Sequence, residues 1–282
     1  MRILGVSAIV ALLLGLGLAP LASAQLPIGG DITNVVPVVT SVTVTGSSFD
    51  PTSGTTTSIP VTTVITDTNG CNDLTTGSSS VTVAVYTSGD VVLVSPAALT
   101  YASCSLGVAA TFSGNALMPF HAAAGTYKVR VAATDQAAGA VSASLVTAPT
   151  FTYGSLVAMT TAASFSFSAA VAPGASTAVS QGIDITNKGN GVMDAQVSGT
   201  ALTLSSPSAS IAVSNVAYSV NSDMSSSTAL SGSATSLAAF DLAAGASSSK
   251  TLYLQLTAPS AASQYLPAGT YSGTLTVTAV SG

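Results

Sequence analysis

The stretch AAGTYKVRVAATD, residues 123–135, decides the fold class of this chain. Its apolar and polar side chains alternate, so that Val129, Val131 and Ala133 fall on one face of an extended chain. A lysine and an arginine fall on the opposite face. Alternation with period two, rich in β-branched residues, predicts a half-buried β-strand.

The tetrapeptide Ala-Gly-Thr-Tyr within this stretch recurs in PAGTYSGTLTVTAV, residues 267–280. Each copy stands near the end of one half of the chain and opens an alternating run. We expect Gly125 and Gly269 to supply tight turns. We expect Tyr127 and Tyr271 to anchor a corner by packing and hydroxyl hydrogen bonding, as tyrosines do in β-sandwiches. The repeat therefore predicts a late sandwich strand in each half, with chance recurrence of common residues as the alternative.

Alternating runs also occur elsewhere, separated by clusters of Gly, Pro, Asn, Asp and Ser. In the first half they are residues 41–46, 59–66, 80–86, 127–134 and 150–153. In the second half they are residues 163–172, 177–187, 191–199, 209–220, 249–259 and 273–280. No sustained helical stripe follows the N-terminal segment. The pattern predicts an all-β chain of two antiparallel β-sandwich domains.

The N-terminus predicts export. A basic start at Met1 and Arg2 precedes an apolar run, and small residues end at Ala24. This is the pattern of a secretory signal peptide over residues 1–24. The alternative is a membrane anchor, which needs a longer apolar span. No later stretch is long and apolar enough to cross a bilayer, so we expect no transmembrane anchor in the mature chain.

The remaining chain divides by composition into three parts. We expect an N-terminal arm at residues 25–36, a first β-sandwich at residues 37–154 and a second β-sandwich at residues 155–282. The arm is apolar towards its end, and one hypothesis is that it adds as a strand to a neighbouring subunit. The alternative, which we prefer at this stage, is that residues 35–39 pair within their own domain.

Charge is scarce, and its sign excludes one class of partner. Charged residues make up 5% of the chain, all ten acidic residues are Asp, and the formal net charge is −5. A weakly acidic surface has no basic stripe with which to neutralise phosphates. We therefore expect no nucleic-acid partner.

Two cysteines, Cys71 and Cys104, remain in a chain that we expect to be exported. An even count in an oxidising compartment predicts one structural disulfide. Closing a loop of about 30 residues stabilises a domain by roughly 3–4 kcal/mol in the chain-entropy model.

The segment TDTNGCND, residues 66–73, is the cluster with ligand-like chemistry. Asp67, Asn69 and Asp73 offer three side-chain oxygens around a glycine, loosely as in a calcium loop. The segment lacks the full EF-hand pattern and its closing Glu. Asn-Gly is also a strong β-turn signal. The turn is the preferred interpretation, no cofactor is required, and calcium is the alternative.

No constellation predicts catalysis. His121 is the one histidine, no G-x-S-x-G elbow accompanies it, and there is no Glu to build a carboxylate pair. The chain has no Trp, which disfavours an extended platform for stacking sugars. We expect a protein that is not an enzyme.

Several motifs resemble known surface domains. The segments VTTVITDTNGCNDL (residues 61–74), VTVAVY (residues 81–86) and AAGTYKVRVAATDQAAGA (residues 123–140) resemble Ig-like domains of secreted prokaryotic surface proteins, archaeal ones especially. The segments ITNKGNG (residues 185–191) and PAGTYSGTLTVTA (residues 267–279) are similar to surface and fibre modules. The resemblance implies tandem Ig-like sandwiches with adhesive, envelope or filament roles, and it brings no catalytic residue.

Together these observations predict a secreted, non-enzymatic cell-surface protein with a structural or adhesive role. Its expected partners are further copies of itself or other envelope proteins, and it is a candidate filament subunit that assembles by strand addition. The alternative is an extracellular carbohydrate-binding module that binds polysaccharide. Ser/Thr tracts leave O-glycosylation open.

Overall fold

A computed structural model describes residues 30–142, 147–167, 169–177 and 182–282. The predicted signal peptide and residues 25–29 of the predicted arm lie outside these described residues. The chain divides into two units, Met1–Asn34 and Val35–Gly282, and every strand belongs to the second. In the described ranges there is no α-helix and no helix able to cross a membrane. The chain is all-β.

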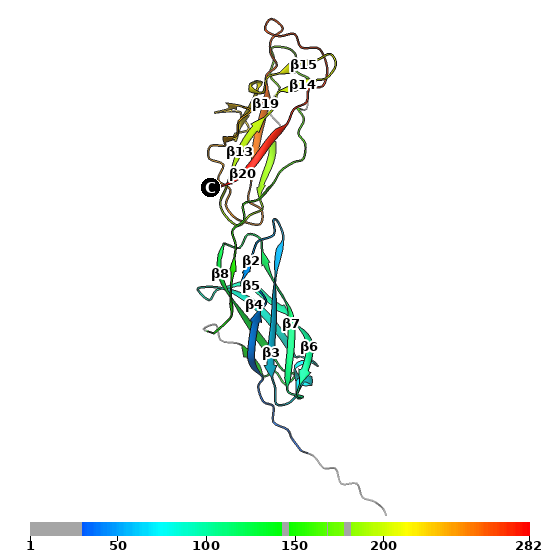
Figure 1. Ribbon diagram of the computed structural model, residues 1–282, viewed down its shortest axis with the longest axis vertical. Coiled ribbons are helices and arrows are strands. Elements are labelled where there is room, and N and C mark those ends of the chain that lie inside the picture. The colour runs from blue at the N-terminus through cyan, green and yellow to red at the C-terminus, as the bar shows by residue number, and fades with distance from the viewer. Residues whose placement is uncertain (1–29, 143–146, 168, 178–181) are drawn as a thin grey trace, which may run out of the picture. The chain divides into compact units, whose positions relative to one another are not determined.

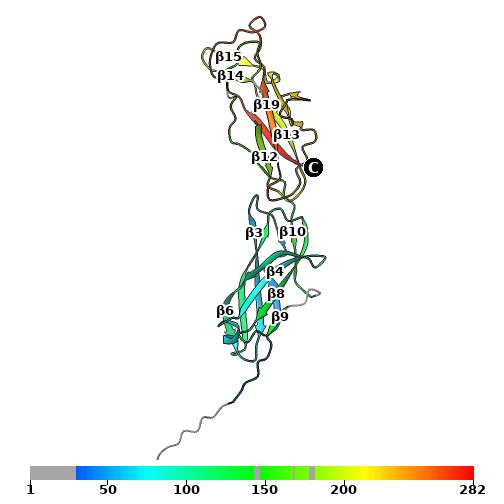
Figure 2. The ribbon, with the colours of Figure 1, turned by 180° about the vertical axis from the view of Figure 1, so that it is seen from behind.

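The strands up to Tyr153 form two sheets, which we call the first sandwich. One sheet has the order β1 (Val38–Val44), β3 (Thr56–Thr66), β7 (Ala109–Pro119), β6 (Thr100–Ser105). The other has the order β2 (Ser48–Phe49), β10 (Thr150–Tyr153), β8 (Gly125–Thr134), β4 (Ser80–Thr87), β5 (Val92–Ala98), and β9 (Ala140–Ser142) also pairs with β8. All pairs are antiparallel except the short pair of β2 with β10. Figures 1 and 2 show these strands from opposite sides.

Alternation builds the core of the first sandwich. On β8, Val129 and Val131 are fully buried, whereas Lys128 and Arg130 between them are partly exposed. Strand β3 likewise buries every second residue from Ile59 onwards. Apolar side chains from both sheets meet in one cluster, as expected for a two-layer sandwich.

The strands from Met159 onwards form the second sandwich. One sheet has the order β11 (Met159–Thr160), β12 (Gly182–Asn187), β19 (Ser249–Leu256), β16 (Val216–Ser219), β17 (Thr228–Ala229). The other has the order β18 (Thr235–Ser236), β13 (Met193–Gly199), β20 (Leu275–Ser281). Strands β14 (Leu202–Leu204) and β15 (Ala209–Ile211) form a separate hairpin. A second apolar cluster, including Phe240 and Leu252, fills the space between these sheets.

Two of the strands predicted for this half differ from the structure. The run at residues 163–172 is not a strand in its described part, because Phe165 and Phe167 pack against the core without joining a ladder. The run at residues 209–220 is divided by a 3₁₀ turn, Val213–Asn215, so that its two ends enter different sheets. Alternation of apolar and polar residues indicates that one face of a segment is buried. A segment can bury one face without hydrogen bonding to a neighbouring strand.

The longest strand missed by the sequence analysis is β7, whose eleven residues pair with β3 and whose first part, residues 109–113, also pairs with β6. Its buried side chains include alanines, so its apolar alternation is inconspicuous. Gly114 packs closely there, because an added Cβ would lie 2.9 Å from Leu99 Cδ2 and would displace that side chain. Small residues in the middle of a sheet thus hide a central strand.

The two copies of Ala-Gly-Thr-Tyr make the same side-chain contact. The Tyr127 hydroxyl donates a hydrogen bond to the Ala123 carbonyl oxygen at 2.5 Å. The Tyr271 hydroxyl donates to the Pro267 carbonyl oxygen at 3.0 Å. Each tyrosine therefore ties its ring to the backbone four residues upstream.

The glycines differ from the expectation. Gly125 does not form the turn but begins β8, opposite Tyr153; the turn lies earlier, at Phe120 and His121. Gly269 lies in a bend, where an added Cβ would be 2.7 Å from Leu204 Cδ1. The strand after the second copy begins at Leu275, because Ser272 instead bridges to Thr203.

A disulfide joins Cys71, in the 3₁₀ turn Cys71–Leu74, to Cys104 on β6. The bonded residues are 33 positions apart in the sequence. The bridge ties the loop after β3 to the hairpin of β6 and β7.

We predict that Tyr127→Phe lowers the free energy of unfolding of the first sandwich by about 1–2 kcal/mol. The ring keeps its stacking on Phe151, at 5.8 Å between centroids, so the loss reports the hydroxyl bond. Urea denaturation of the full chain measures it. The matched control is Tyr101→Phe, at a side chain that is 43% exposed, with an expected change below about 0.5 kcal/mol. Equal losses in the two variants would refute the anchoring role of Tyr127.

Candidate functional site

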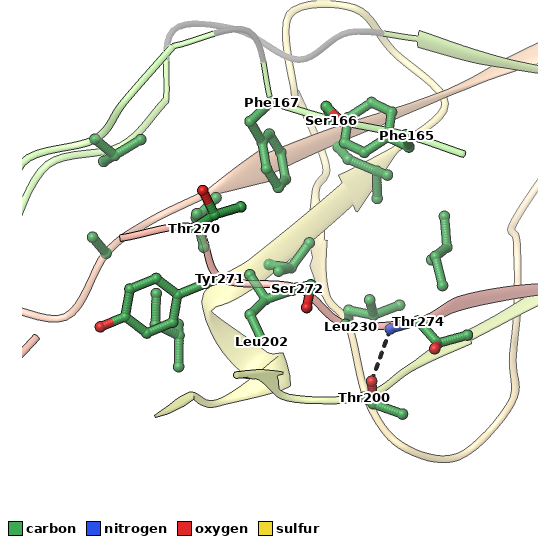
Figure 3. Close-up of a pocket in the computed structure, with 18 of the residues that line it drawn as sticks. Phe165, Ser166, Phe167, Thr200, Leu202, Leu230, Thr270, Tyr271, Ser272 and Thr274 are labelled. Carbon is green, nitrogen blue, oxygen red and sulfur yellow. Dashed lines mark hydrogen bonds between the residues drawn. The ribbon is translucent and has the colours of Figure 1, made fainter. Parts of the chain in front are cut away.

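A cleft of about 1000 Å³ opens in the second sandwich. One side is the coil at residues 161–173, apart from the undescribed Ser168, and the other is the segment at residues 266–277. Figure 3 shows Phe165 and Phe167 on one side, with residues 270–274 running past them. We call this feature the apolar cleft.

The floor of the apolar cleft is the core of the second sandwich. Ile183, Leu230 and Leu254 line it, and all three are buried members of the apolar cluster. The rings of Phe165 and Phe167 form an edge-to-face pair at 5.0 Å between centroids beside it. The core is therefore open to the surface at this point.

The rim of the cleft is polar but uncharged. The Thr274 amide donates to Thr200 Oγ1 at 2.9 Å, as drawn in Figure 3. Thr203 and Ser272 exchange two backbone hydrogen bonds of 2.8 and 3.0 Å. No lining residue is acidic, basic or a histidine. Such a site can bind apolar side chains and an extended backbone, and its described lining offers no acid–base pair.

Strand β20 borders this cleft and has an open edge. All seven of its residues pair with β13, and no described strand pairs with its other edge. Leu275, Val277 and Ala279 pack against the core, and none of the strand's residues is charged. Soluble proteins usually protect such an edge with charges or a covering segment. The edge of β20 has the geometry of an acceptor for an added strand.

The described end of the predicted arm exposes apolar side chains. Ile32 is 89% exposed and Val36 is 48% exposed. The Val35 amide donates to Asn69 Oδ1 at 2.7 Å, and β1 begins at Val38. Pairing within its own domain therefore holds for Val38 and Val39, and residues 30–34 are in no strand.

The predicted calcium-loop residues lie at one end of the first sandwich. Asp67 and Asp73 approach each other, and the structure adds Asp135, which the sequence analysis did not include. Asn69 instead directs its Oδ1 to Val35. The signal for Asp135 was present in the sequence, since β3 and β8 both end in Thr and are directly followed by Asp. These two strands belong to different sheets, so only the packing of one sheet on the other brings their ends together.

The Asp67 carboxyl has an unusual environment. It is 1% exposed, and its Oδ1 accepts a hydrogen bond from the Asn69 amide at 2.8 Å. Burial raises the pKa of Asp67 above its ordinary value, the Asn69 amide opposes this, and the charges of Asp73 and Asp135 raise the pKa further. The surroundings therefore disfavour an uncompensated negative charge.

Aromatic side chains do not form a stacking platform among the described residues. The two most exposed tyrosines of the described residues, Tyr101 and Tyr265, belong to different sandwiches. His121 lies in the turn after β7 with its ring edge-on to Phe120. These positions give no support to the carbohydrate-binding alternative.

A scan against protein-family models finds no match, and a search of curated proteins finds none either. Among solved structures, the chain is similar to the C-terminal domain of the Streptococcus agalactiae AgI/II polypeptide BspA, with 11% identity over 87% of this chain and 96% of that one and a TM-score of 0.21. It is also similar to the C-terminal domain of the Streptococcus pyogenes antigen I/II-family protein AspA, with 10% identity over 88% and 96% and a TM-score of 0.24. Such TM-scores do not establish a shared fold.

We predict that Phe165→Ala costs about 1–2 kcal/mol of unfolding free energy, because its half-buried ring borders an open cleft. The matched variant is Phe240→Ala in the closed core, where the ring is 1% exposed and a loss of about 3–5 kcal/mol is expected. Chemical denaturation of the full chain measures both. Equal losses would show that the region around Phe165 is a closed core.

Proposed function

We propose that this chain is a secreted, non-enzymatic structural or adhesive protein of the cell surface that assembles into filaments by strand addition. The observation that carries the proposal is the apolar cleft beside the open edge of β20. The proposed occupant is the N-terminal arm of a second copy of this chain.

The arm has a side-chain pattern that suits the cleft. In an extended conformation Leu26, Ile28 and Ile32 share one face, whereas Asp31 and Thr33 share the other. The stretch from residue 26 to residue 32 spans about 20 Å when extended. Its apolar face would enter the cleft, and its backbone would pair with β20.

Backbone pairing supplies affinity in this mode without charged contacts. That suits a chain with 5% charged residues. The arm and the cleft are different surfaces of the same chain, so the contact is heterologous. Heterologous contacts that do not close into a ring produce open filaments.

Export and a structural role have separate support. The predicted signal peptide and the disulfide between Cys71 and Cys104 both suit an oxidising compartment outside the cytoplasm. The cleft's uncharged lining favours recognition of a polypeptide over acid–base catalysis. Other envelope proteins that carry a comparable apolar strand would be further partners.

We predict that the chain from residue 25 to residue 282 forms filaments or large oligomers, whereas a chain from residue 35 is monomeric. This truncation keeps Val35 and its hydrogen bond to Asn69. Negative-stain microscopy and light scattering after size exclusion provide the readout. Ile32→Asp tests the same contact without truncation, and Thr33→Asp, on the opposite face, is its control. Monomers from the chain that starts at residue 25 would contradict assembly.

The arm's place in the cleft is testable by fluorescence, because the chain has no Trp. We predict that a peptide of residues 25–36 shifts the emission of the F165W variant, built on the chain from residue 35, to shorter wavelength. The peptide excludes water from the indole there. A scrambled peptide and the Y265W variant, at a side chain that is 80% exposed outside the cleft, are the controls. An equal shift in both variants, or no shift in either, would exclude the cleft as the acceptor of the arm. Polysaccharide would then be the next ligand to test.

A further inference from the structure

Three aspartates from separate segments meet at one end of the first sandwich. Asp67 directly follows β3, Asp73 lies in the 3₁₀ turn Cys71–Leu74, and Asp135 directly follows β8. One carboxylate oxygen from each lies within 4.8 Å of one from each of the others. The cluster therefore brings together acidic side chains from loops that follow strands of both sheets of the sandwich.

Asp67 supplies an independent sign of a missing ligand. Its Oδ1 accepts from the Asn69 amide, but its Oδ2 is buried and accepts no hydrogen bond. A buried carboxylate oxygen without a hydrogen-bond partner is unfavourable, because it has lost its contact with water and gained no other donor. Buried charges are normally paired or bound to a metal ion.

The cationic side chains of the described residues are engaged elsewhere. Lys128 pairs with Asp90 at 2.6 Å, and Lys250 donates to the Ala239 carbonyl oxygen at 2.7 Å. Arg130 lies over a tyrosine ring and Lys188 over a phenylalanine ring. The buried Asp67 Oδ2 is thus left for a proton or a bound cation to balance.

The surrounding backbone holds the three carboxylates in place. The Gln136 amide donates to the Asp73 carbonyl oxygen at 2.9 Å, which ties the two Asp loops together. The Asp135 carboxylate accepts from the Gly139 amide at 2.7 Å. Cys71 lies between Asp67 and Asp73 in the sequence, and the disulfide anchors it to Cys104. A site whose ligands are already positioned loses less entropy when the ion binds.

We propose that Asp67, Asp73 and Asp135 bind one calcium ion. A set made of carboxylate oxygens alone is a hard-ligand set, which suits Ca²⁺ and disfavours zinc or copper. Calcium accepts six to eight oxygen ligands in flexible geometry, so carbonyl oxygens and water complete its shell. This site is separate from the apolar cleft and does not depend on the proposed filament function.

Calcium at this position would link the loop after β3 to the loop after β8. It would also hold the turn at Asn69, to which the Val35 amide bonds. A dissociation constant of about 10⁻⁴–10⁻³ M is typical of extracellular calcium modules. We expect this range, which matches a protein that meets abundant calcium outside the cell.

The test uses the chain from residue 25 to residue 282, with its N-terminal arm in place, after removal of metal by a chelator. We expect calcium chloride to raise the melting temperature in a saturable way and calorimetry to give one ion per chain. Sodium chloride at equal ionic strength gives no such rise. In D67N and D73N the affinity falls at least about tenfold, because each variant loses a charged ligand. D90N, which removes a carboxylate elsewhere in the same sandwich, responds as the unmodified chain does.

A second measurement separates ligand loss from misfolding. Without calcium, D67N should be at least as stable as the unmodified chain, because it removes a buried charge from the cluster. With saturating calcium the order should reverse. The Asp73 side chain is partly exposed, so D73N keeps the fold by circular dichroism even if D67N does not. Absence of a calcium response in the unmodified chain, or an unchanged response in D73N, would overturn the proposal.

Discussion

The burial of every second side chain between two hydrogen-bonded sheets is the interaction on which this structure depends. Charged residues make up 5% of the chain, so ion pairs stabilise little of it. In each sandwich one apolar cluster is built from alternate residues of both sheets. In the first sandwich the two sheets have four and six strands. In the second sandwich one sheet has three strands, and the core reaches the surface in the apolar cleft.

Much of the fold follows from alternation in the sequence. The predicted strand at residues 150–153 is confirmed as β10, and the runs at residues 80–86 and 127–134 are confirmed within one or two residues as β4 and β8. Strand β7 was missed because small side chains hide its buried face. The run at residues 163–172 was mistaken for a strand because alternation reports burial, whereas ladder pairing depends on distant segments.

The candidate sites were less predictable for the same reason. Asp67 and Asp73 lie in one loop, so their proximity could be predicted from the sequence. Asp135 comes from a loop more than sixty residues later, and it joins them because β3 and β8 end at the same end of the sandwich. The apolar cleft is also a product of tertiary structure, since its lining combines the coil before β12 with the segment before β20. Neither the three aspartates nor the lining of the cleft can be recognised from a local sequence pattern.

In the proposed filament, the arm of one copy occupies the cleft of another. Cross-linking between two different chains tests it most directly: one carries Ile32→Cys and the other carries Val277→Cys. The account predicts a disulfide-linked dimer on non-reducing gels when the two are mixed under mild oxidation, and far less when either is oxidised alone. A dimer that forms equally well from the Ile32→Cys chain alone, or no dimer in the mixture, would contradict the account.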